Sequence, residues 1–123
     1  MNILLDTNFI IELVKNKLDF DEVKEYGKIC IPRQVLVELE DLSVEGEFKD
    51  RKIAELALKI IVKNQEKFRI IELDKRYVDL GIRRFIDKNK GFIVATMDKE
   101  LKMSLAGRAR ILNIVNRKKL ILL

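Results

Sequence analysis

The 123-residue sequence contains no histidine and no tryptophan, and it has one cysteine and one proline. The lack of histidine excludes Ser-His-Asp and Cys-His catalysis, histidine-ligated zinc and the most common general base near neutral pH. A single cysteine without histidine also excludes an internal disulfide and the common zinc ligand sets. Any catalytic chemistry must therefore come from carboxylates, hydroxyls, amines or a metal ion held by oxygen.

Long apolar runs and clusters of glycine or proline are also missing. No apolar stretch approaches the roughly 20 residues of a membrane-spanning helix, and the opening residues MNILLDTNF lack the basic region of a secretory signal. The lone Pro32 and the five scattered glycines mark no linker, so we expect a single domain over residues 1–123. We also expect a cytoplasmic protein without membrane association, in which Cys30, between two isoleucines, is a buried structural thiol.

Charge is distributed unevenly along the chain. Residues 1–48 hold 5 Lys/Arg against 11 Asp/Glu, a balance of −6, whereas residues 49–123 hold 20 against 9, a balance of +11. A basic half favours binding to a polyanion, although a solvated surface on a Lys- and Glu-rich chain explains the charge equally well. The same composition resembles that of proteins from thermophiles, in which ion-pair networks are favoured.

Short apolar runs alternate with helical patterns. Apolar runs predict strands at residues 2–5, 28–31, 68–73, 92–96 and 111–115, with an edge strand at 120–123. Apolar residues at helical spacing predict helices at residues 9–14, 19–26, 32–42, 51–65, 76–88 and 98–106, and residues 43–50 are predicted to form a polar loop. Continuous apolar strands between helices indicate a parallel sheet covered on both faces. The predicted fold class is α/β, a three-layer α/β/α sandwich around a central parallel sheet of four to five strands.

Three carboxylates stand at informative places. Asp6 directly follows the first predicted strand, and Asp98 follows the fourth by two residues; each is also a good helix cap. Glu38 lies at the edge of an apolar helical stripe, where its side chain either reaches water or points into a cleft. Because functional groups in parallel sheets gather past the carboxyl ends of the strands, we expect Asp6 and Asp98 at one edge. Carboxylates at such short distances repel one another unless a cation lies between them, and hard divalent ions prefer oxygen ligands.

Three segments together resemble the motifs of PIN-domain nucleases. They are LLDTN at residues 4–8, VLVEL at 35–39 and VATMDKEL at 94–101, in the order and spacing of that family. The resemblance covers the whole chain and implies metal-dependent cleavage of single-stranded RNA with Mg²⁺ or Mn²⁺. It also implies that Asp6, Glu38 and Asp98 are the catalytic metal ligands. The supporting residues that it implies are Thr7, Asn8, Thr96 and Glu100, the last of which could assist a second metal.

A further acid of the family pattern is harder to place. The family carries a segment such as Asp-Asp-Ala-Ile or Asp-Ala-Leu-Ile before the fourth strand, and this chain has YVDLGI at residues 77–82. When Ile82 is aligned with the isoleucine of the family segment, Asp79 takes the place of the first acid of that segment. Leu80 then takes the place of the acid that occurs more regularly in the family. Asp79 is therefore either a catalytic metal ligand with a small shift or a helix cap with water in the place of the ligand. Asp74 and Asp87 are weaker candidates.

The resemblance implies in-line attack of a metal-activated water on a phosphodiester. Four basic residues near the proposed edge are candidates for binding RNA phosphates, with a solvated helix face as the alternative: Arg83, Arg84, Lys99 and Lys102.

The biological role is open between two alternatives. One is the toxin of a toxin–antitoxin pair, with an antitoxin as partner. The other is rRNA processing with a ribosome-assembly protein as partner, because the sequence of residues 95–101 resembles that of archaeal PIN proteins related to small-subunit processing factors. A homodimer fits both roles. The alternative to an enzyme is a degenerate PIN module that binds RNA or a protein without cutting. A phosphate-dependent receiver module is disfavoured, because no middle strand ends in a suitable acid.

Overall fold

The computed structural model describes residues 1–74 and 76–123 and has a six-stranded sheet at its centre, in the order β3-β2-β1-β4-β5-β6. The strands are β1 (Asn2–Leu5), β2 (Lys28–Pro32), β3 (Phe68–Ile71), β4 (Phe92–Ala95), β5 (Arg110–Val115) and β6 (Lys119–Leu122). The first five pair in parallel, and β6 pairs antiparallel with β5 at one edge. The predicted parallel sheet and the predicted edge strand are both confirmed.

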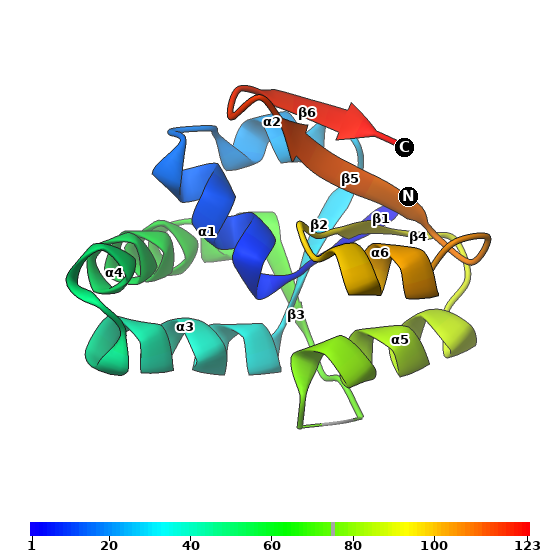
Figure 1. Cartoon of the computed structure of the whole chain (residues 1–123), viewed down its shortest axis with the longest axis horizontal. Helices are drawn as coiled ribbons and strands as arrows, with labels where there is room; N and C mark the ends of the chain where they lie inside the picture. The colour runs from blue at the N-terminus through cyan, green and yellow to red at the C-terminus, as the bar shows by residue number, and fades with distance from the viewer. Residues whose placement is uncertain (75) are drawn as a thin grey trace.

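Helices cover both faces of this sheet. They are α1 (Thr7–Lys15), α2 (Phe20–Lys24), α3 (Arg33–Glu45), α4 (Phe48–Lys63), α5 (Val78–Lys88) and α6 (Lys99–Ser104), with a short 3-10 turn, η1 (Gln65–Lys67), after α4. In Figure 1, α1, α3 and α4 gather on one side of the strands and α5 and α6 on the other, which confirms the three-layer arrangement. Among the described residues, no helix is both long and apolar enough to cross a membrane.

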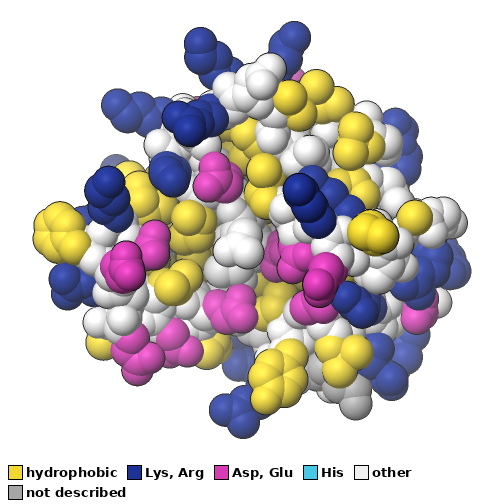
Figure 2. Space-filling model, in the orientation of Figure 1, with side chains coloured by type: hydrophobic (Ala, Val, Ile, Leu, Met, Phe, Trp, Pro, Cys, Tyr) yellow, Lys and Arg dark blue, Asp and Glu magenta, His cyan; other side chains and the backbone are white. Residues whose placement is uncertain are grey.

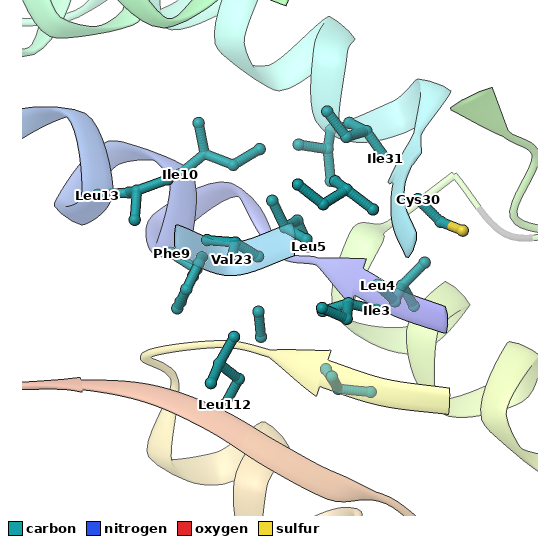
Figure 3. Close-up of a cluster of buried hydrophobic side chains, with 14 of the residues drawn as sticks. Ile3, Leu4, Leu5, Phe9, Ile10, Leu13, Val23, Cys30, Ile31 and Leu112 are labelled. Atoms are coloured by element: carbon teal, nitrogen blue, oxygen red, sulfur yellow. The ribbon is translucent and has the colours of Figure 1, made fainter. Parts of the chain in front are cut away.

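The strand β1 shows why the strands are continuous apolar runs. Its residues Ile3, Leu4 and Leu5 are all fully buried, since helices cover the two faces to which successive side chains point. They pack in the cluster of Figure 3 with side chains of α1 and of neighbouring strands. Cys30 on β2 is a free, buried thiol, as predicted, and burial raises its pKa.

The polar loop predicted for residues 43–50 is wrong. Helix α3 continues to Glu45 and α4 begins at Phe48, so only Gly46 and Glu47 connect the two helices. The predicted loop rested on polar composition, but both helix ends are amphipathic and exposed, and the two helices pack along each other. The strand predicted at residues 68–73 ends at Ile71, and the helix predicted from residue 76 begins at Val78.

The sheet has a switch point between β1 and β4. The chain moves outward from β1 through β2 to β3 and then returns to place β4 on the other side of β1. The backbone N–H of Asp6 donates to the carbonyl of Ala95 at 2.9 Å, so the carboxyl ends of β1 and β4 are fixed beside each other. In open α/β sheets, such a point leaves a crevice between the diverging connections.

A glycine allows α5 to approach this region closely. A Cβ atom at Gly81 would lie 3.0 Å from both Cβ and Cδ1 of Leu73, which is 3% exposed. Leu73 cannot easily withdraw, because its backbone N–H and C=O both bond the side-chain amide of Gln34. The absence of a side chain at position 81 therefore sets the distance of α5 from the loop before it.

We expect Gly81→Ala to lower the free energy of unfolding by up to about 2 kcal/mol, because an overpacking cost of roughly 1–3 kcal/mol exceeds the helical gain of about 1 kcal/mol. Chemical denaturation of the variant measures this change. In a Leu73→Ala background, where the crowded side chain is shortened, the same substitution should cost less. A single variant stabilised by the full helical gain would show that the contact is not restrictive.

Candidate active site

A cleft of about 570 Å³ opens at the switch point of the sheet. Its walls come from the beginnings of α1 and α5, from α3 and from the residue that precedes α6. All four carboxylates predicted as catalytic metal ligands line it: Asp6, Glu38, Asp79 and Asp98. Figure 2 shows acidic side chains on both sides of the hollow at the centre of this face. The structure thus brings together residues that lie up to 92 positions apart in the sequence.

Asp6 is the most buried of these acids, with 8% of its surface exposed. It is the N-cap of α1, and its Oδ1 accepts a hydrogen bond from the Thr7 N–H at 2.9 Å. Its Oδ2 accepts one from the Thr96 hydroxyl at 2.7 Å. The predicted cap and the predicted site residue are therefore the same side chain.

Thr96 joins the two strand ends chemically. It is fully buried, and while its Oγ1 donates to Asp6 it also accepts a hydrogen bond from the backbone N–H of Asp98 at 3.1 Å. One hydroxyl thus orients the Asp6 carboxylate and the backbone that carries Asp98. The supporting role of Thr96 stays a prediction, to which these two hydrogen bonds give a structural basis.

The environment of Asp6 disfavours its charged form. Burial is the largest cause and raises its pKa, whereas the hydrogen bonds from Thr96 and Thr7 lower it. The negative charges of Glu38 and Asp98 raise the pKa further. On balance the pKa of Asp6 lies above its ordinary value of 3.8.

Glu38 and Asp98 are each oriented through one oxygen. The Thr7 hydroxyl donates to Oε1 of Glu38, which connects the start of α1 to the middle of α3. Asp98 caps α6, and its Oδ1 accepts hydrogen bonds from the backbone N–H groups of Glu100 and Leu101 at 2.8 and 3.1 Å. The Glu100 side chain is not part of the cleft wall; its backbone N–H is what supports Asp98.

Asp79 enters the cleft from the first turn of α5. Its Oδ2 lies 3.0 Å from Nη2 of Arg83, one helical turn later. Its Oδ1 is buried and has no hydrogen-bond partner among the described residues, and Nε of Arg83 is in the same condition. Leu80 is 45% exposed and does not line the cleft.

Two further acids line the cleft that are not predicted from the sequence. Asp41 and Glu45 lie on α3 at spacings of three and seven residues from Glu38. Residues at these spacings share one face of a helix. That spacing is a signal in the sequence, but many exposed helix faces carry the same pattern.

The four basic residues predicted to bind RNA lie outside the cleft wall. Arg83 is paired with Asp79, and Arg84 bonds Oδ2 of Asp74 at 3.2 Å. Lys99 and Lys102 on α6 form no ion pair with any residue that the structure describes. Burial lowers the pKa of Lys102, and the nearby charge of Lys99 lowers it further.

The cleft has the donor chemistry of a hard divalent cation, since its ionisable groups are all carboxylates. The buried Oδ1 of Asp79, which has no partner in residues 1–74 and 76–123, and the mutual repulsion at Asp6 both favour a cation in this space. As the side chains stand, no three acids in residues 1–74 and 76–123 form a ready ligand group. The residues fit such an ion in chemistry, and their carboxylates must turn to share it.

Comparisons with known proteins agree with the fold of this chain. The PIN like domain family matches residues 3–119 of the chain. The chain is 30% identical to Ribonuclease VapC4 of Methanocaldococcus jannaschii over 122 residues, which cover 95% of this chain and 92% of that protein. The structure of this chain resembles that of the PIN domain endonuclease Utp24, with a TM-score of 0.79 and 29% identity. The match covers 98% of this chain and 90% of the other.

We expect Asp6→Asn to raise the thermal midpoint of the metal-free protein at pH 7 by roughly 2–5 °C. The pKa of Asp6 is raised in the folded state, so the folded chain holds this proton more tightly than the unfolded chain does. The free energy of unfolding therefore falls as pH rises from 3.8 through the folded-state pKa and Asp6 ionises. Asparagine stays neutral, its Oδ1 can accept from the Thr7 N–H, and its Nδ2 can donate to the Thr96 hydroxyl in place of accepting from it, so the gain should vanish below pH 3.8. Thermal unfolding in EDTA across pH, with the exposed Glu66→Gln as control, measures the difference. A loss of stability at pH 7 would contradict the expected cost of the buried charge.

Proposed function

The chain belongs to the PIN-like domain family, and on this basis we propose that it is a metal-dependent endoribonuclease that hydrolyses phosphodiester bonds of single-stranded RNA in the cytoplasm. The observation that carries the proposal is the convergence of Asp6, Glu38, Asp79 and Asp98 on one cleft at the switch point of the sheet. The names of both relatives, a ribonuclease and an endonuclease, support the same reaction.

Mg²⁺ or Mn²⁺ is the proposed cofactor, held by Asp6 and Asp98 with Glu38 and Asp79. A bound divalent ion lowers the pKa of a water molecule and stabilises the charge that develops on the phosphate. The chain's own groups orient the carboxylates: Thr96 positions Asp6, and the backbone of α6 positions Asp98.

Glu38 is the proposed residue that orients the attacking water. It is exposed to the cleft, and the Thr7 hydroxyl fixes one of its oxygens. With no histidine in the chain, a carboxylate is the side chain available to accept a proton near neutral pH. Asp79 remains free to ligate through Oδ1, the oxygen that has no partner among the described residues.

For RNA phosphates we propose Lys99 and Lys102 as the principal contacts of the four predicted residues. The two side chains lie on α6, close to Asp98, and are not engaged in ion pairs within the described part of the chain. Arg83 and Arg84 are each paired with an aspartate, so they must give up an existing contact before they bind a phosphate.

Two biological roles fit this reaction: RNA processing, with a ribosome-assembly protein as partner, and toxin activity, with an antitoxin as partner. A small gene directly upstream that encodes an antitoxin would favour the toxin. A homodimer is compatible with both roles. The alternative function is a degenerate PIN module that binds RNA or protein without cleavage; a thermal midpoint that does not respond to Mn²⁺ would favour it.

We expect the protein to cleave a labelled single-stranded RNA with Mg²⁺ or Mn²⁺, and Asp98→Asn to reduce the rate roughly 100-fold or more. Asparagine caps helices as well as aspartate does, so α6 should stay folded and the loss should report the missing charge. Asp6→Asn should behave alike, and Glu66→Gln should cut as the wild type does. Equal cutting by all four proteins would contradict the assigned site.

Replacement of both Lys99 and Lys102 by alanine should weaken RNA binding about 10-fold at low salt and reduce the salt slope by about 1–2, because two phosphate contacts are lost. The effect should be similar for different RNA sequences. The matched control is Lys59→Ala with Lys63→Ala, two exposed lysines on α4. If the control pair weakens binding equally, the phosphate contacts are not specific to α6.

A further inference from the structure

A second cleft, of about 510 Å³, adjoins the acidic cleft and shares Glu38 and Asp41 with it. Its wall also contains Arg76 and Tyr77, from the segment before α5, and Val37 of α3. We propose that this cleft is a nucleotide subsite in which one unpaired RNA base, next to the scissile phosphate, stacks on Tyr77. The inference rests on the proposed function and assigns part of its substrate site.

The side chain of Tyr77 is exposed to solvent, so its ring is accessible to a base, which is not true of a core residue. It is 73% exposed, and its hydroxyl bonds no residue that the structure describes. Tyr26, the other tyrosine, is half-buried and donates its hydroxyl to the carbonyl of Leu120 at 3.3 Å. An exposed aromatic side chain beside a phosphate-cleaving site can stack on any base, because every base has a π-face.

Residues 72–74, shortly before Tyr77, are anchored to neighbouring helices. Both oxygens of Glu72 accept hydrogen bonds from Arg33, at 2.7 and 2.8 Å. Leu73 is held on α3 through Gln34, and Asp74 is held on α5 through Arg84 and Lys88. At the far end, the carbonyl of Tyr77 accepts from the N–H of Gly81 at 2.9 Å. Residues 72–74 and the backbone of Tyr77 are thus held before a base binds, and groups that are already held lose less conformational freedom on binding.

The other walls suit a nucleotide as well. Val37 is 40% exposed and gives an apolar surface in the same cleft. Arg76 is exposed and forms no ion pair with the described residues, so its guanidinium is free for a phosphate or for stacking. Arg33 is already paired with Glu72, so Arg76 is, among the described residues that line this cleft, the cation without an ion pair.

Stacking on Tyr77 requires a base that has left its neighbours. A duplex keeps its bases paired and stacked, whereas the bases of a single strand can turn outward onto an aromatic ring. The subsite therefore gives a structural reason for the choice of single-stranded RNA, and it favours stacking over recognition of one sequence.

The test combines protein variants with single abasic positions in a labelled single-stranded RNA that the wild type cuts with Mn²⁺. Tyr77→Ala should raise KM roughly 5- to 100-fold and leave kcat within about twofold, because the lost contact exists before and during the reaction. Tyr77→Phe should retain the wild-type KM. At one abasic position beside the cut, wild type and Tyr77→Ala should have equal KM values, since the base that stacks is missing.

Phe48→Ala is the matched control, because Phe48 is a 65% exposed aromatic residue outside both clefts. The proposal is overturned if Tyr77→Ala keeps the wild-type KM, if Phe48→Ala shows the same loss, or if the loss persists on every abasic RNA. In those three cases the wild type still cuts RNA, and the proposed function stands. If the wild type neither binds nor cuts the RNA, the proposed function fails and the subsite fails with it.

Discussion

The candidate site depends on one constraint: negative carboxylates, one of them buried, are held close together where β1 and β4 end. Asp6 is nearly buried, and Glu38 and Asp98 lie close enough to disfavour its ionisation. The fold tolerates this cost because the Thr7 and Thr96 hydroxyls hold the carboxylates in place and a large apolar core lies directly beneath them. The same repulsion makes the cleft receptive to a cation.

Much of the fold could be predicted because its signals are local. The continuous apolar runs mark strands buried on both faces, and Asp6 and Asp98 can be placed at one edge from strand order alone. The residues of the cleft wall at positions 6, 38 and 98 follow from this topology and from the family resemblance, whereas Asp79 departs from the family pattern and its sequence leaves a helix cap as the alternative. The loop predicted at residues 43–50 is wrong because polar composition does not distinguish a loop from an exposed helix end.

The rest of the site depends on tertiary distances that no local pattern encodes. Asp41 and Glu45 carry a helical spacing that is ordinary on a solvated face, and only the position of α5 turns it into a cleft wall. The pairing of Asp79 with Arg83 and the anchoring of residues 72–74 to two helices likewise require the folded chain. In the sequence, Tyr77 is one aromatic residue that belongs to no motif. The structure shows that it is exposed and lines a cleft, and this position indicates a binding role.

The double use of Asp6 and Asp98 as helix caps and as cleft carboxylates has an evolutionary consequence. Asparagine caps a helix equally well, and one nucleotide change converts an aspartate codon into an asparagine codon. A lineage can therefore lose the charge on which catalysis is proposed to depend while every strand and helix stays in place. Gene copies released from selection for cleavage would keep a folded scaffold with an intact groove, a ready starting point for proteins that bind what their ancestors cut.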